Sequence, residues 1–295
     1  MNDKEIRSIL KELKCQELSE NISFEAFKSV EDGAEYEVWL ICDGDKKYVL
    51  KKAKAYELDL YLTFFKDEVE GVPRFEGACK IDGVDYFLME YVSGKDICCC
   101  DRSSLIKVLD ALISIQEAFW ADSEHKDCGF SFERSLVGRT DRGKYLGEEI
   151  FEHVYNDFLE EYKRLPRTLC HDDLLPFNVI VSDDKAYLID WEYGGILPYP
   201  ASLARLLAHG EEKDGAMFYI KDSDRQFAID YYYEKLIKSK NISYSEYRKT
   251  MELFLFYEYC EWIMLGNKYD DASPDLTEKY VNLAKAHLKL LSNYN

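Results

Sequence analysis

Basic residues are too few to balance the acidic ones in this sequence, and no long apolar run is present. The 38 Lys and Arg residues are outnumbered by 57 Asp and Glu residues, which gives a net charge of −19 at pH 7. A surface this acidic repels phosphate backbones and anionic lipid, which argues against nucleic acid or a membrane as partners. No stretch could cross a bilayer, and the first residues lack the apolar core of a signal peptide. We therefore expect a cytoplasmic protein whose ligand is cationic, or is an anion held by Mg²⁺.

Paired cysteine motifs and histidine ligand motifs are missing as well. The nine cysteines form no CxxC unit, and an odd count suits reduced thiols better than a disulfide scaffold. Neighbouring side chains of the run Cys98-Cys99-Cys100 would point to opposite faces of an extended chain, an arrangement poorly suited to one metal ion. The five histidines show no HxxxH-type spacing. We expect ordinary reduced thiols.

The chain changes character near residue 94. The part before it combines helical spacing at 4–14 and 54–66 with strand-like segments at 23–30, 35–42, 47–52 and, as a hairpin, 77–91. The part after it is dominated by amphipathic helices, with two short β-runs at 178–181 and 186–189. The helices are expected at about 101–119, 142–164, 201–209, 223–238, 244–266 and 275–292. The pattern predicts an α+β protein with a small antiparallel β-sheet lobe, residues 1–93, and a larger, mostly helical lobe, residues 94–295.

One segment combines carboxylate and amide side chains at a spacing that indicates catalysis. It reads HDDLLPFN over 171–178 and, after the two β-runs, LIDWE over 188–192. Phosphoryl transfer from ATP requires a carboxylate beside the acceptor hydroxyl and oxygen ligands for Mg²⁺. Asp173, Asn178 and Asp190 supply this set, provided that the β-runs form a hairpin that returns Asp190 alongside Asn178. Mg²⁺ commonly takes one or two carboxylates and completes its shell with phosphates and water.

The stretch HDDLLPFN…LIDWE resembles the aminoglycoside phosphotransferase and choline kinase family, whose members carry His-x-Asp-x-x-x-x-Asn and then Ile-Asp-Trp/Phe-Glu. The resemblance implies a bilobal, protein-kinase-like fold and a kinase that transfers the γ-phosphate of ATP or GTP to a hydroxyl of a small molecule. Asp173 would be the catalytic base, Asn178 and Asp190 would hold Mg²⁺, and His171 would be structural. Where the family usually has Asp-Leu-Ala in the next helix, this chain has Ser202-Leu203-Ala204, so a buried carboxylate is missing there.

The small lobe supplies candidates for holding the phosphates. Strand alternation over 47–52 places Val49 and Lys51 on one face and Lys52 on the other. We therefore assign the phosphate contact to Lys51 and the roof of an apolar purine slot to Val49. Glu57 in the next helix is the expected partner of Lys51, with Glu68 or Glu70 as alternatives. The loop 29–34 would cover the phosphates, although its single glycine makes it a weak motif.

The segment 87–94, FLMEYVSG, looks like the hinge between the lobes of such kinases. Backbone groups of Glu90 and Val92 would pair with the purine edge, and Met89 would line the back of the pocket. Ile180 and Ile189, which flank the metal-binding positions, would form the floor of the purine slot. Plain core packing is compatible with all three apolar assignments.

The chemical class of the molecule that accepts the phosphate is inferred from the helix at 244–266. Its aromatic residues share one stripe with Glu258, Glu261 and Trp262. Carboxylates are costly to bury there unless a cation compensates them, and aromatic faces attract ammonium groups. Together with Glu192, beside Asp190, this stripe predicts a cationic acceptor such as an amino sugar or a choline-like amine. Alternatively, Glu258 and Glu261 lie at a solvated edge or pair with a neighbouring Arg or Lys.

Two other functions are compatible with the same motif. A protein kinase would carry a long activation segment ending in Ala-Pro-Glu, which this chain lacks. A nucleotide-binding, pseudokinase-like module that regulates a partner would tolerate loss of the catalytic positions. All of these positions are filled here, by Lys51, Asp173, Asn178 and Asp190. Magnesium-dependent turnover of ATP with a hydroxyl acceptor would separate the three functions.

Overall fold

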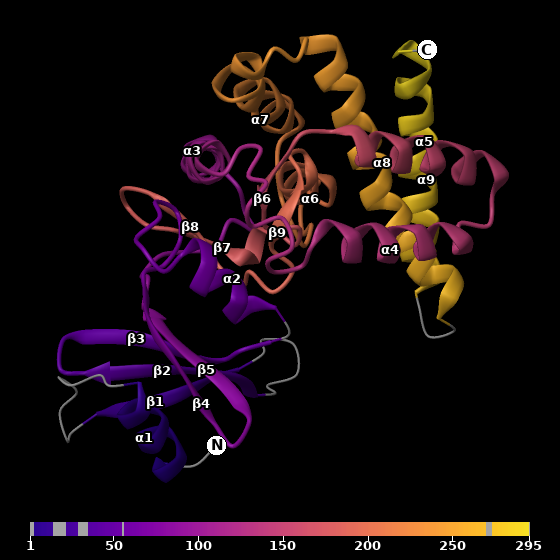
Figure 1. Ribbon diagram of the computed structural model, residues 1–295. Coiled ribbons are helices and arrows are strands. Elements are labelled where there is room, and N and C mark those ends of the chain that lie inside the picture. The colour runs from indigo at the N-terminus through magenta and orange to yellow at the C-terminus, as the bar shows by residue number, and fades with distance from the viewer. Residues whose placement is uncertain (1–2, 14–21, 29–34, 55, 270–272, 295) are drawn as a thin grey trace.

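The computed structural model describes residues 3–13, 22–28, 35–54, 56–269 and 273–294. In Figure 1 a small sheet with its helices lies below a larger group of helices, and the chain passes from one to the other after β5. The α+β architecture predicted from the sequence is confirmed. None of the helices in the described ranges combines the length and the apolar character needed to span a bilayer.

The small sheet has five antiparallel strands in the order β1-β2-β3-β5-β4. They are β1 (Ser23–Lys28), β2 (Glu35–Asp43), β3 (Lys46–Lys52), β4 (Phe75–Ile81) and β5 (Val84–Glu90). The β2–β3 and β4–β5 hairpins turn where the sequence predicts. In the second hairpin Asp82 and Gly83 both have positive φ, +50° and +82°, as a type I′ turn requires. The predicted loop 29–34 lies outside the described residues.

The two faces of this sheet have different neighbours because side chains alternate along each strand. α1 (Asp3–Glu12) covers one face, where Ile9 and Leu10 form a core with Leu50 and Leu88. α2 (Glu57–Phe64) lies against the other face. Its Leu60 belongs, with Phe87 of β5, to the core that extends through the helical region.

α2 is attached to the helical region as well as to the sheet. The carboxylate of Asp59 accepts a hydrogen bond of 3.1 Å from the backbone N–H of Gly129. The ring of Phe64 packs edge-on against Phe119, with 5.1 Å between the ring centroids. Phe65, which ends the helix, packs in the same way against Trp191 at 4.8 Å. The helix that follows β3 is therefore held from both sides.

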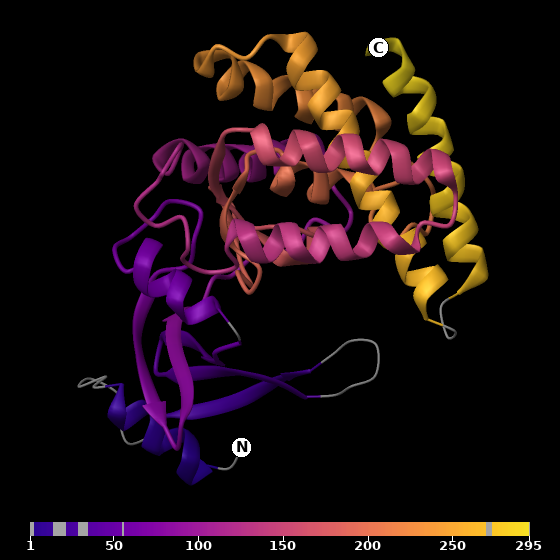
Figure 2. The same ribbon diagram turned by 45° about the vertical axis from the view of Figure 1, so that its right-hand side comes forward.

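The larger region is built mostly from helices. They are α3 (Arg102–Ala118), α4 (Phe132–Arg142), α5 (Glu149–Arg164), α6 (Ala201–Ala208), α7 (Asp222–Lys235), α8 (Tyr244–Lys268) and α9 (Pro274–Leu291). α9 lies along α8, while α5 and α6 pack on it (Figure 2). α8 buries Glu258 together with its aromatic residues, so a carboxylate lies inside this region.

The structure differs from the sequence prediction at α4 and in one small sheet. The helix expected over 142–164 is α5 alone, and α4 precedes it. The apolar periodicity of α4 is weak because two of its buried residues are Ser135 and Arg139. β6 (Arg167–Cys170) pairs with β9 (Gly195–Pro198), and the local pattern of two four-residue strands so far apart in the chain does not reveal their pairing.

Candidate active site

The HDDLLPFN segment forms the loop between β6 and β7 (Val179–Val181), and His171 anchors it. The backbone N–H of His171 donates to Oγ of Ser202 on α6 at 2.9 Å. Nε2 of the buried ring lies 2.7 Å from the carbonyl oxygen of Ile189, which can only accept, so this nitrogen carries the proton. Burial lowers the pKa of His171 to about 4, which keeps the ring neutral. His171 thus joins the loop that carries Asp173 to the segment that carries Asp190.

The hairpin predicted between Asn178 and Asp190 is present. β7 pairs with β8 (Ala186–Leu188), and the N–H of Ile189 then donates to the backbone carbonyl of Asn178 at 3.0 Å. The side-chain amide of Asn178 donates to the carbonyl oxygen of Asp173 at 2.8 Å, so its Oδ1 is the atom that could bind a cation. Asp172 and Asp190 have positive φ, +57° and +63°. Such backbone strain in residues other than glycine is typical of functional sites.

Lys51 contacts two carboxylates from different parts of the chain. Its Nζ lies 2.6 Å from Oε1 of Glu57 and 2.5 Å from Oδ1 of Asp190. Burial raises the pKa of Glu57 above its ordinary value, although Lys51 opposes the shift. Burial alone would also raise the pKa of Asp190, but the ammonium of Lys51 outweighs it and the pKa is lowered. Lys52 points the other way, as alternation predicts, and pairs with Glu37 at the surface.

Two oxygen donors near Lys51 suit a magnesium ion. Asn178 offers an amide oxygen and Asp190 an ionised carboxylate, which are ligand types that Mg²⁺ prefers. Two protein ligands are also the usual number where phosphates and water complete the shell. The donor set therefore fits an ion that binds together with a nucleotide.

The residues expected at the purine lie around the linker between sheet and helices. Val49 and Met89 are neighbours across the β3–β5 pair, and both lie on the face that carries Lys51. Glu90 and Val92 lie where the chain leaves β5. The backbone of Lys95 then pairs in both directions with Val181, at 3.0 and 2.8 Å.

This pairing brings the linker directly over Ile180. A Cβ atom at Gly94 would lie 2.4 Å from the carbonyl oxygen of Val181 and 2.7 Å from Cγ2 of Ile180, so only glycine fits there. Ile189 follows β8 directly and precedes Asp190, and its backbone N–H donates to the carbonyl of Asn178. The six residues expected at the purine thus come from β3, β5, the linker, the β7–β8 hairpin and the residue that follows it.

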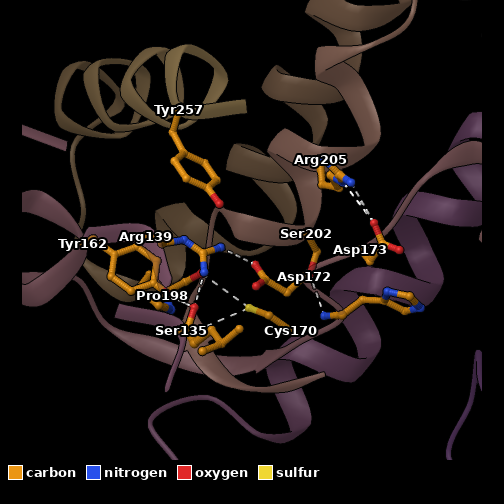
Figure 3. Close-up of polar contacts among 12 residues, drawn as sticks. Ser135, Arg139, Tyr162, Cys170, Asp172, Asp173, Pro198, Ser202, Arg205 and Tyr257 are labelled. Atoms are coloured by element: carbon orange, nitrogen blue, oxygen red, sulfur yellow. Dashed lines mark hydrogen bonds and ion pairs between the residues drawn. The ribbon is translucent and has the colours of Figure 1, made fainter. Parts of the chain in front are cut away.

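Asp173 forms an ion pair with Arg205, a residue of α6 (Figure 3). Nε and Nη2 of Arg205 both donate to Oδ1 of Asp173, at 3.1 and 2.9 Å. Burial raises the pKa of Asp173 to about 6, although the Arg205 guanidinium opposes the shift. The carboxylate expected to act as a base is therefore partly buried and held by a cation.

Arg205 also compensates the carboxylates of the aromatic stripe. Its Nη1 donates to Glu258 at 2.9 Å and to Glu261 at 3.2 Å. Arg142 lies 2.5 Å from the other oxygen of Glu261, to which the Tyr257 hydroxyl also donates. Burial would raise the pKa of Glu261, but Arg142 and Arg205 together lower it to about 2. Of the alternatives that the sequence allows, the structure shows pairing with arginine.

The remaining two acceptor candidates also have partners within the chain. Glu192 pairs with Lys54, which follows β3, at 2.9 Å. Trp262 is half-buried and stacks on Tyr280 of α9, with 5.4 Å between ring centroids and 7° between ring planes. Glu192 bridges sheet and helical region, whereas Trp262 lies at the contact of α8 with α9.

Sequence reasoning missed Arg139 of α4 and Arg205 of α6, and it gave Ser202 no role. Arg139 is buried, pairs with Asp172 at 2.7 Å and lies over the rings of Tyr162 and Tyr257 (Figure 3). Ser202 takes the place of the expected aspartate, because its hydroxyl accepts the backbone hydrogen bond from the catalytic loop. Arg205 follows Ser202 by three residues and so lies on the same side of α6. That spacing was the available signal for Arg205.

The fold is protein-kinase-like. The choline kinase LicA from Streptococcus pneumoniae superposes with a TM-score of 0.57 at 15% identity, over 96% of this chain and 99% of that one. A thermostable mutant of an aminoglycoside phosphotransferase, solved with AMP-PNP and hygromycin B, superposes with a TM-score of 0.58 at 11% identity, over 90% and 93%. At these identities the likeness shows the fold.

The sequence itself defines the family. The phosphotransferase enzyme family profile matches residues 26–234, and the chain belongs to that family. The resemblance identified from HDDLLPFN…LIDWE is thereby confirmed. Protein LicA of Haemophilus influenzae is 21% identical over 138 residues, which are 47% of this chain and 49% of that protein. The match thus spans about half the length of that curated relative.

Proposed function

We propose that this protein is a kinase that transfers the γ-phosphate of ATP or GTP to a hydroxyl group of a small molecule, with Mg²⁺ as cofactor. The observation that carries the proposal is the convergence of three segments at one place. Lys51 comes from β3, Asp190 from the end of the β7–β8 hairpin, and Asn178 hydrogen-bonds the backbone of Asp173. These are the groups that phosphoryl transfer requires.

Each residue has a role that follows from its contacts. Asp173 orients the acceptor hydroxyl and takes its proton as the oxygen forms a bond to the γ-phosphorus. The bond from that phosphorus to the bridging oxygen breaks, and the nucleoside diphosphate leaves. Lys51, fixed by Glu57, binds the phosphates of the nucleotide. Asn178 and Asp190 would hold Mg²⁺, which neutralises charge on the phosphates when it is bound.

The nucleotide base would lie between the sheet and the β7–β8 hairpin. Val49 and Met89 would cover one face of the purine, while Ile180 and Ile189 would contact the other. The backbone of Glu90 and Val92 would pair with its edge. Support for a nucleotide comes also from the superposed aminoglycoside phosphotransferase, which was solved with AMP-PNP.

A cationic acceptor remains a prediction of the net charge of −19, because Glu192 is already paired with Lys54. Glu258 and Glu261 no longer support it, because Arg205 and Arg142 compensate both. Trp262 could still offer an aromatic face to an ammonium group. Among the superposed proteins one is a choline kinase and another was solved with hygromycin B, so both kinds of acceptor belong in a screen.

The test is a screen for Mg²⁺-dependent formation of ADP or GDP. Choline, ethanolamine, aminoglycosides, neutral sugars and hydroxy amino acids are supplied as acceptors, and the phosphorylated product is identified by mass. We expect turnover of at least one acceptor class, and a rate lower by roughly 10²–10⁴ for Asp173→Asn. Binding of MgATP to the wild-type protein with no turnover of any acceptor would favour a regulatory module. Phosphorylation of protein alone would favour a protein kinase.

A further inference from the structure

Two N–H groups of one guanidinium converge on a single carboxylate oxygen at the proposed base. Nε and Nη2 of Arg205 lie 3.1 and 2.9 Å from Oδ1 of Asp173, and neither contact uses Oδ2. The Asp173 side chain remains 28% exposed, so a small molecule can reach it. The planar guanidinium presents its donors in a fixed fork, which restricts how the carboxylate can turn.

Arg205 is in turn fixed from a second helix. Its Nη1 donates to Oε2 of Glu258, which is only 3% exposed, and to Oε2 of Glu261. Nε2 of His209, one turn further along α6, lies 3.3 Å from the same nitrogen. One guanidinium therefore serves three carboxylates from the catalytic loop and α8, and its position cannot shift without breaking several charge-assisted hydrogen bonds.

We propose that Arg205 is a positioning residue for Asp173: it fixes Oδ1 so that Oδ2 faces the acceptor hydroxyl and receives its proton. This inference rests on the proposed kinase function. Without Arg205, the carboxylate of Asp173 could rotate, and it would lie near the negative charges of Glu258 and Glu261. A misplacement of about 1 Å at a reacting group can cost roughly 10²-fold in rate.

The experiment compares Arg205→Gln and Arg205→Lys with the wild type, using an acceptor found in the screen and MgATP. We expect kcat to fall roughly 10²-fold in Arg205→Gln, while KM for MgATP stays within about twofold. Lysine keeps the charge and can donate to Oδ1 but lacks the fork, so Arg205→Lys should recover part of the lost kcat. Because a smaller folded fraction would also lower the apparent kcat and leave KM unchanged, kcat is expressed per folded molecule, counted from the stoichiometry of MgATP binding.

Arg248→Gln is the matched control for loss of a half-buried arginine. The Arg248 side chain is 16% exposed, as is that of Arg205, and it pairs with the buried Glu252 of α8 at 3.1 Å. We expect Arg248→Gln to lower the melting temperature while kcat per folded molecule stays unchanged. Should Arg205→Gln fail to fold because Glu258 is left unpaired, the double variant Arg205→Gln/Glu258→Gln removes both buried charges and is used in its place.

The outcomes separate the two proposals. If the wild type is active and the Arg205 variant keeps its kcat within about threefold, the positioning role is wrong and the kinase function stands. The proposal is also overturned if Arg205→Gln lowers kcat by the same factor in Asp173→Asn as in the wild type, because Arg205 would then not act through Asp173. If the wild type phosphorylates no hydroxyl compound at all, the proposed function fails, and this inference fails with it.

Discussion

Lys51 and Asp190, 139 residues apart in the chain, form a direct contact of 2.5 Å between Nζ and Oδ1. The same ammonium contacts Glu57 at 2.6 Å. One positive charge is therefore shared by two carboxylates, and the three side chains together retain a negative charge. That excess suits a divalent cation that arrives with a nucleotide, since Mg²⁺ favours carboxylate oxygen.

Replacing Asp190 should weaken binding of the metal–nucleotide complex itself. We expect Asp190→Ala to lower MgATP affinity by at least about tenfold, because even outer-shell changes around metals cost roughly 10–100-fold. The measurement is the rise in melting temperature with MgATP concentration. Lys52→Ala is the control, since Lys52 pairs with Glu37 on the outer face of β3. An unchanged MgATP titration in Asp190→Ala would contradict the assignment.

Replacing Asp173 should affect the rate and leave nucleotide binding intact. We expect Asp173→Ala to lower kcat by roughly 10²–10⁴, the usual contribution of a positioned general base. The two aspartate variants should therefore differ: Asp173→Ala loses kcat and keeps its affinity for MgATP, whereas Asp190→Ala loses that affinity. Near-normal turnover in Asp173→Ala would show that another group accepts the proton.

The activity should fall at mildly acidic pH. Burial raises the pKa of Asp173 to about 6, with Arg205 opposing the shift, and only the ionised carboxylate can accept a proton. As the pH decreases through 6, the ionised fraction and kcat/KM should therefore fall, by about tenfold per pH unit below the pKa. The residual activity of Asp173→Asn should lack this limb. If the limb persists in that variant, it belongs to another group.

Gly94→Ala should disturb the linker over the proposed purine site. The added Cβ would lie 2.4 Å from the carbonyl oxygen of Val181. Forcing extra volume into a closed contact typically costs about 1–3 kcal/mol, so we expect a lower melting temperature and weaker ATP binding. Gly138→Ala in α4 is the control, because its Cβ would meet nothing within 4 Å. It should stabilise the helix by roughly 0.5–1 kcal/mol.

Sequence reasoning succeeded where a short pattern determines the geometry. Strand alternation separated Lys51 from Lys52, and two β-runs of a few residues were enough to place Asp190 beside Asn178. The small sheet followed in the same way from alternation and two turn sequences. In each case the contacts involve neighbours along one strand or one hairpin.

It left alternatives open where the partner lies on a different helix. Glu258 and Glu261 share a helical stripe with aromatic residues, but the stripe does not reveal that Arg205 and Arg142 pack against it. Their pairing depends on how α6 and α4 cross α8. The sequence therefore could not show which cation neutralises these two carboxylates, because a cationic ligand and an arginine side chain were equally compatible with the pattern.

The attachment of α2 has a consequence for control of activity. To separate Glu57 from Lys51, a regulator would have to move α2 away from Gly129, Phe119 and Trp191. Such a movement would expose Leu60 and Phe64, at a cost of about 1.5–3 kcal/mol for each side chain. A switch that works by swinging this helix is thus energetically unfavourable.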